Sequence, residues 1–175
     1  MTMKRSRFAR SAFAVSLAGP LFTACLPAPA GNTTSAQTVH TSSEDVLMSG
    51  RTVRIQTAVE GDVAAAGEDI TIDGPVGGYV MGAGRHITLE APVENDVWLA
   101  GEQVDVESEI GSNAMIAGRI VTLRPGTVVS DNARLAGEHV RSEAHVSRDL
   151  RVGAITAEIG GEIEGQVYAA ANQVR

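Results

Sequence analysis

The chain has 175 residues, a formal net charge of −7, few aromatic residues (3%) and 19 glycines. This length fits one domain with a tail, and the abundance of valine, isoleucine and alanine favours stacked short strands over a core of large side chains. The acidic charge argues against a nucleic-acid partner, because binding phosphate needs positive charge. The single cysteine excludes an internal disulfide framework and a cysteine-based zinc site.

Residues 1–24 have the pattern of an export signal. A basic start is followed by the apolar, small-residue stretch SAFAVSLAGPLFTA, which is too short to span a bilayer as a stable helix. The basic residues of this start are Lys4, Arg5, Arg7 and Arg10. Without them the chain keeps 10 basic against 21 acidic side chains, a net charge of −11.

Two cleavage sites compete at the end of this segment. The run LFTAC, ending at Cys25, resembles a bacterial lipobox, in which the cysteine is lipidated and becomes the new N-terminus. The second site follows Ala28-Pro29-Ala30 and would remove the cysteine altogether. Residues 25–41 are rich in Pro, Ala, Ser and Thr and have no apolar period, which predicts a flexible tether.

Residues 42–175 repeat one unit of 17 residues, most clearly in VENDVWLAGEQVDVESE from Val93 to Glu109. A fixed period of this size is typical of a solenoid, in which each copy forms one coil and its neighbours supply the core. The spacing is 17 throughout except for 19 between Ile110 and Val129, and we number the residues of each copy from position 1. The eight copies begin at Ser42, Val59, Val76, Val93, Ile110, Val129, Val146 and Ile163.

Apolar residues recur at positions 5 and 7, at 12 and 14, and at position 1. Residues two apart on a strand point to the same side, so these positions predict two inward-facing strand segments and a shorter third one. Position 9 is glycine in the first six copies, where we expect a sharp turn or a positive φ. Position 4 is mostly Asp or Asn, which we expect to bond locally at a turn. The extra two residues fit in Arg124 to Val128 as a bulged corner.

Position 10 alternates in charge along the first six copies. Stacked about 4.8 Å apart, these residues form a ladder of opposite charges that disfavours a one-coil slip. They are Arg51, Glu68, Arg85, Glu102, Arg119 and Glu138.

Other solenoids fit less well. Hexapeptide helices need an aliphatic residue at position 13, which here holds residues such as Arg54, Thr71 and Asp105. Calcium-binding nonapeptide rolls need Gly-Gly-x-Gly-x-Asp every nine residues, and pectate-lyase-type enzymes have long loops; neither feature occurs. The sequence therefore predicts an all-β, single-stranded, three-sided β-solenoid of about seven and a half coils.

The short glycine-rich coils, as in VEGDV from Val59 and ITIDG from Ile70, resemble the bactofilin family of bacterial polymer-forming cytoskeletal proteins. The resemblance covers residues 42–175 and rests on the style of the repeat. It implies a right-handed β-helix that polymerises end to end without a nucleotide and often sits at a membrane through its N-terminal tail. Bactofilins are typically cytoplasmic, whereas this chain has the pattern of an exported protein, so we expect an exported relative.

Two surfaces are candidates for contacts. The last copy stops at Arg175, and an uncovered solenoid end is a set of strand edges that we expect to stack on another copy. The residues of this end are Ile163, Val167, Tyr168 and Val174. The second surface is an outward stripe at position 6 of the first five copies, about 19 Å long, which we name the apolar stripe. It consists of Leu47, Ala64, Met81, Trp98 and Met115, and Tyr168 returns an aromatic to it in the last copy.

No motif for catalysis, cofactor binding or metal binding stands out. His86 and His139 share position 11 but lie about 14 Å apart, too far to hold one metal ion. The carboxylates follow one another along the outside without a facing pair for acid–base chemistry. We expect a non-enzymatic, polymer-forming scaffold of the cell envelope that requires no cofactor and associates by strand pairing at its ends. If cleavage occurs at the lipobox, it is anchored to a membrane through Cys25. The alternative is a monomeric module whose stripe or acidic faces hold a glycan or an envelope protein.

Overall fold

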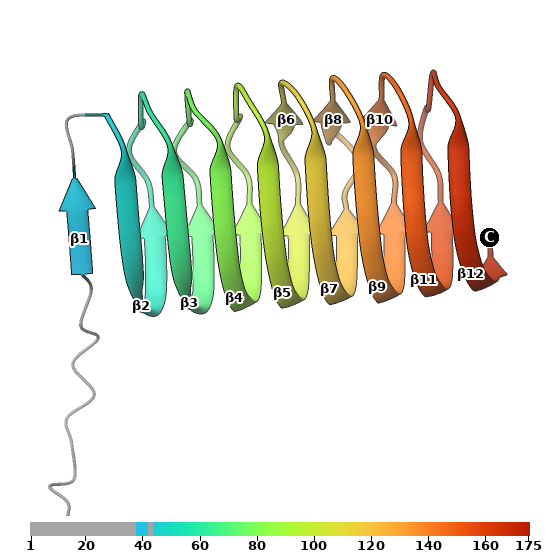
Figure 1. Ribbon diagram of the computed structural model, residues 1–175, viewed down its shortest axis with the longest axis horizontal. Coiled ribbons are helices and arrows are strands. Elements are labelled where there is room, and N and C mark those ends of the chain that lie inside the picture. Colours follow the sequence, from blue (N-terminus) through green and yellow to red (C-terminus); the bar gives the residue numbers. More distant parts are fainter. Residues whose placement is uncertain (1–37, 42–43) are drawn as a thin grey trace, which may run out of the picture. The chain divides into compact units, whose positions relative to one another are not determined.

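The computed structural model describes residues 38–41 and 44–175, which form strands, turns and loops without a helix. Eight parallel strands and one antiparallel strand make the main sheet, and each coil of about 17 residues contributes one long strand (Figure 1). The chain runs down the near side, up the far side and on to the next coil, so the solenoid is right-handed. The predicted β-solenoid is confirmed, with about eight coils.

The long strands start at position 5 of each coil and, except for the last, run to position 14, passing the corner at position 9. They are β2 (Val46–Ile55), β3 (Val63–Ile72), β4 (Val80–Leu89), β5 (Val97–Val106), β7 (Ala114–Leu123), β9 (Ala133–Ser142), β11 (Leu150–Ile159) and β12 (Val167–Val174). The third side is a short ladder at position 1, made of β6 (Glu109–Ile110), β8 (Val128–Val129) and β10 (His145–Val146), which isolated bridges extend in both directions.

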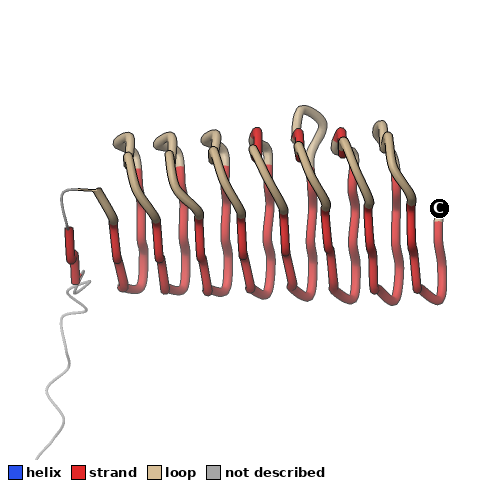
Figure 2. The backbone as a smooth tube through the Cα atoms, turned by 45° about the horizontal axis from the view of Figure 1, so that its top comes forward, coloured by secondary structure: helices blue, strands red, loops and turns tan. Residues whose placement is uncertain are grey.

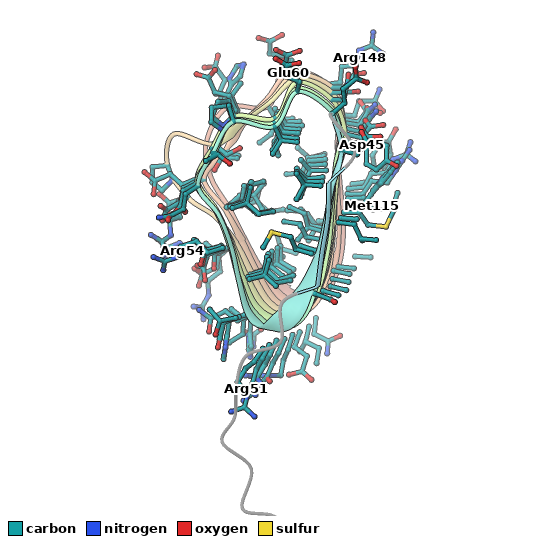
Figure 3. The ribbon with its side chains drawn as sticks, turned by 90° about the vertical axis from the view of Figure 1, so that its left-hand side faces the viewer. Asp45, Arg51, Arg54, Glu60, Met115 and Arg148 are labelled. Carbon is teal, nitrogen blue, oxygen red and sulfur yellow. The ribbon has the colours of Figure 1, made fainter. Side chains whose placement is uncertain are left out.

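Neighbouring coils keep the register that the repeat predicts. Val63 pairs with Val80 and Val80 with Val97, and the side chains of positions 1, 5, 7, 12 and 14 form one continuous core. Figure 3, which looks along the coils, shows these side chains stacked inside the backbone loop. The extra two residues of the fifth copy lie between Leu123 and Val128, where Figure 2 shows a wider loop and Gly126 has a φ of 97°.

Glycine at position 9 has a different physical reason from the expected one. Among the described residues only Gly126 and Gly161 have a positive φ, so the position 9 glycines are not needed for backbone conformation. A Cβ added at Gly67 would lie 2.5 Å from the carbonyl oxygen of Gly50, and one at Gly101 would lie 2.8 Å from that of Gly84. From the second coil to the sixth, glycine leaves room for the close approach of the preceding coil, whereas the seventh and eighth coils have Ala154 and Ala171 at this position.

The Asp and Asn residues of position 4 also differ from expectation, because they bond to the next coil rather than locally. Asp45 Oδ1 accepts a hydrogen bond of 3.0 Å from the Asp62 N–H, and Asp96 Oδ1 accepts one of 2.9 Å from the Asn113 N–H. The Asn113 side chain continues the ladder to Asn132 through a hydrogen bond of 3.1 Å. These bonds hold each coil in register with its neighbour.

The last four residues of the predicted tether belong to a strand. Residues 38–41, expected in the tether, form β1 (Thr38–Thr41), which pairs antiparallel with residues 46–49 of β2. A tether sequence joins the sheet here because the first half of β2 would otherwise be an unpaired edge. Residues 1–37 and 42–43, including the predicted export signal and Cys25, lie outside the described residues.

Candidate contact surfaces

The C-terminal coil exposes side chains that the other coils bury. In β11, Leu150 and Ala157 are fully buried, but Val167 and Val174, one coil further, are 48% and 54% exposed. Ile163 is half-buried, and Tyr168 is exposed on the outer side of the same coil. The four residues predicted for the self-association end therefore lie together on the terminal coil, and its interior side chains make an apolar surface.

The apolar stripe occupies neighbouring positions on successive strands, as its spacing predicts. Leu47 pairs with Ala64, Ala64 with Met81, Met81 with Trp98, and Trp98 with Met115. Leu47, Met81 and Met115 are 54%, 47% and 45% exposed. In Figure 3, Met115 projects outward on the side of the coil opposite Arg54, which stands on the polar face formed by positions 11 and 13.

Trp98 is half-buried because Tyr79, on the preceding coil, packs beside it with ring centroids 5.4 Å apart and a tilt of 50°. The pair is a tilted aromatic contact of the kind that stabilises a sheet surface. Tyr79 stands at position 4, where the other copies have Asp, Asn or Gln, and its N–H donates a hydrogen bond of 3.1 Å to Asp62 Oδ1. The negative charge of Asp62 raises the pKa of the Tyr79 hydroxyl. The sequence analysis did not single out this residue, although an aromatic side chain at position 4, where the other copies have Asp, Asn or Gln, could have indicated it.

A row of small residues runs beside the apolar stripe and was also missed. Position 8 is outward and exposed from the second coil to the eighth, and it is never larger than alanine there. Its members are Ala66, Ala83, Ala100, Ala117, Ala136, Gly153 and Ala170. Positions 6 and 8 together form what we name the stripe face. They contain no acidic residue in any coil, whereas the polar face contains Asp69, Asp105 and Glu158.

The C-terminal half of the stripe face is hollowed into an open groove of about 810 Å³. Met115 and Tyr168 stand at its ends, and Arg134 and Arg151 lie between them over the row of small residues. A Cβ added at Gly153 would meet nothing within 4 Å, so the groove is open above this residue.

The two arginines of the groove are register neighbours on β9 and β11. Like charges on adjacent strands repel one another. Arg151 lies 5.3 Å from the centre of the Tyr168 ring and 3.9 Å from Asp149, whereas Arg134 forms no ion pair within the described chain. The groove therefore carries positive charge on an otherwise acidic protein.

The charge ladder at position 10 exists in part. Arg51 and Arg85 both pair with Glu68, and Arg119 Nη2 lies 2.9 Å from Glu102 Oε1. All of these side chains are at least one-third exposed, so their main effect is registration rather than stability.

Two of the histidines, His86 and His145, lie beside carboxylates at the surface. His86 Nδ1 lies 2.9 Å from Asp69 Oδ1, and His145 lies within 3.7 Å of Glu162 and 3.5 Å of Glu164. Within residues 38–41 and 44–175, no group of three or more His, Cys, Asp or Glu residues is placed to hold a metal ion. The same part of the chain contains no helix with the length and apolarity to cross a membrane.

Comparisons with known proteins add no relative to this description. No protein-family model, no curated protein and no solved structure matches the chain.

Proposed function

We propose that this protein is a non-enzymatic structural protein of the bacterial cell envelope that self-associates through the end of its solenoid. The observation that carries the proposal is the exposure of Val167 and Val174, whose equivalents one coil earlier, Leu150 and Ala157, are fully buried. Burying such apolar surface against a second copy is favourable by about 25 cal/mol per Å². The mechanism is edge-to-edge strand pairing, which continues the ladder of backbone hydrogen bonds that each coil makes with the next.

The two ends are not equivalent in this proposal. β1 pairs with residues 46–49 of β2, so part of the N-terminal edge already has a partner strand. β12 is the last strand of the sheet at the other end, and its edge is the main surface for pairing. The predicted export signal supports a location in the envelope, and lipidation at Cys25 would hold the solenoid near a membrane through the remaining tether. The bactofilin-like style of the repeat supports assembly as the role.

The proposal is tested by placing a charge at the open end of the full chain. Val167→Arg and Val174→Arg should prevent filaments and end-paired dimers, because pairing at the end would bury an uncompensated charge. Ile155→Arg is the matched control, since Ile155 is 52% exposed but lies at a corner of the seventh coil. Light scattering after size exclusion over a range of concentrations, with electron microscopy of the large fractions, gives the readout. A parent protein that stays monomeric at high concentration would contradict the proposal.

A second function is a monomeric binding module for a glycan or an envelope protein. The aromatic pair of Trp98 and Tyr79 on an exposed sheet surface favours it, because aromatic side chains are common at recognition surfaces. Under this alternative the end substitutions change nothing, and Trp98→Ala abolishes capture of the glycan or protein.

A further inference from the structure

We propose that the stripe face is an interface with a second copy of this chain, packed face to face with the two solenoid axes antiparallel. This contact is separate from pairing at the ends and does not depend on it. The surface is large enough for such a role. The stripe face and the neighbouring position 4 together span five residues, positions 4 to 8, so eight coils about 4.8 Å apart give a contact area of about 34 Å by about 15 Å. Two such faces bury roughly 1,000 Å² in total, the lower limit for a specific interface.

Charge decides between the two symmetric ways of packing this face on itself. A two-fold axis parallel to the solenoid would place each coil on its own equivalent, so the Arg134 and Arg151 side chains of both copies would gather on the same facing coils. The face has no acid at positions 6 and 8 to neutralise them. A two-fold axis across the solenoid places the first coil on the eighth and the second on the seventh. Arg134 then faces Met81, and Arg151 faces Ala64.

The antiparallel arrangement also gives Arg151 a new carboxylate. Asp62 lies at position 4 of the second coil, two residues from Ala64, and would stand beside Arg151 of the other copy. Arg151 already lies 3.9 Å from Asp149 of the seventh coil, so it would bridge carboxylates of both copies. The carboxylate of Asp62, in the N-terminal half of one copy, therefore complements the charge of Arg151, in the C-terminal half of the other copy.

The shapes of the two halves fit the same arrangement. The N-terminal half carries projecting side chains, Leu47, Met81 and Trp98, and the C-terminal half carries the groove of about 810 Å³. The two-fold axis passes between the fourth and fifth coils, so Trp98 of each copy meets Met115 of the other. Energetically dominant residues of interfaces lie near the centre and are often tryptophan, and sulfur–aromatic contacts are favourable.

The first test is sedimentation equilibrium on the full chain and on variants, all in the background Val174→Arg, which blocks end pairing at a residue outside the groove. Trp98→Ala should raise the dimer dissociation constant about thirtyfold, as expected on loss of a central aromatic anchor. Ile155→Ala, which removes an exposed apolar side chain outside the stripe face, should leave the dissociation constant unchanged. A monomeric background protein, or a dimer that Trp98→Ala does not weaken, overturns the proposal without bearing on the ends.

The second test measures the arrangement by cross-linking in a Cys25→Ser background. Ala66→Cys stands on the second coil and Gly153→Cys on the seventh, where the groove has room for a side chain. A maleimide linker of about 10 Å, the usual distance between packed sheets, should join the two variants when they are mixed. Neither variant alone should cross-link, because its own equivalent lies about five coils away. Cross-linking of either variant with itself, or none in the mixture, would overturn the antiparallel arrangement.

Discussion

The fourth and eighth coils follow the same repeat, but they differ in what their inward side chains contact. Val97 and Val104 of the fourth coil are fully buried between two neighbouring coils, whereas Val167 and Val174 of the eighth are about half exposed. The residue types at these positions are the same. Burial in a solenoid is therefore supplied by the next coil and not by the coil itself.

The largest expected effect comes from placing a charge at equivalent positions of the two coils. Val97→Asp should cost more than about 4 kcal/mol of unfolding free energy, because it buries an unpaired carboxylate in the continuous core. Val167→Asp should cost less than about 1 kcal/mol in the monomer, since that side chain reaches water. Urea denaturation followed by circular dichroism measures both. Equal losses at the two sites would show that the terminal coil is as tightly packed as the middle ones.

The close approach of coils at the position 9 corner gives the second effect. Gly101→Ala should destabilise the protein by about 1–3 kcal/mol, because the new Cβ lies 2.8 Å from the Gly84 carbonyl oxygen and the coils must separate. Gly153→Ala, at an open outward site, should be neutral or stabilise by up to about 1 kcal/mol by restricting the unfolded chain. Thermal unfolding of the two variants gives the comparison. A tolerated alanine at Gly101 would mean that the ladder relaxes easily.

The architecture could be predicted from the sequence because every copy of the repeat shows the same pattern of apolar positions and corners. The apolar positions recur every 17 residues, and the corner glycines do so in the first six copies, which fixed the register between coils. The two extra residues near Arg124 interrupt this spacing once, which fixed the insertion site. The reason for Gly67 and Gly101 could not be predicted, because it depends on the distance between backbones of adjacent coils. β1 was missed for a similar reason, since the sequence of residues 38–41 has no repeat pattern and pairs only with the edge that β2 presents.

The candidate surfaces were predicted less completely than the fold. The position 6 stripe and the open C-terminal coil followed from alternation along a strand. The groove did not, because it arises from the small residues of position 8 lying beside long arginine side chains on several coils. Tyr79 packs on Trp98 from another coil, a contact between residues that are 19 apart in sequence and become neighbours only when the coils stack.

Ser142 places a polar side chain in the core of the sixth coil, and we expect its replacement to have a smaller effect on stability. It occupies position 14, where the first five copies have Ile, Leu or Val, and its fully buried hydroxyl has no hydrogen-bond partner in the described chain. Ser142→Val should raise the unfolding free energy by about 1–2 kcal/mol, because it removes an unpaired polar group and fills the apolar stack. Denaturant titration provides the measurement. A loss of stability would indicate that the hydroxyl is satisfied in solution and that the sixth coil has no room for a larger side chain.

The smallest expected effect is on the loss of stability at low pH through the carboxyl group of Asp96. The N–H and side-chain amide of Asn113, one coil later, donate to Asp96 and hold the pKa of this carboxyl below its ordinary value. A carboxyl whose pKa is lowered by folding stabilises the protein above the pKa of the unfolded chain and loses that contribution as the pH falls below about 4. Asp96→Asn keeps an acceptor, as Asn113 and Asn132 do in the following coils, but it does not titrate. The variant should therefore lose less stability than the parent between pH 7 and pH 3, by under about 1 kcal/mol because solvent screens the half-buried site. Parallel pH dependence of the two proteins would mean that the amide of the next coil does not favour the charged form, and that this ladder serves registration alone.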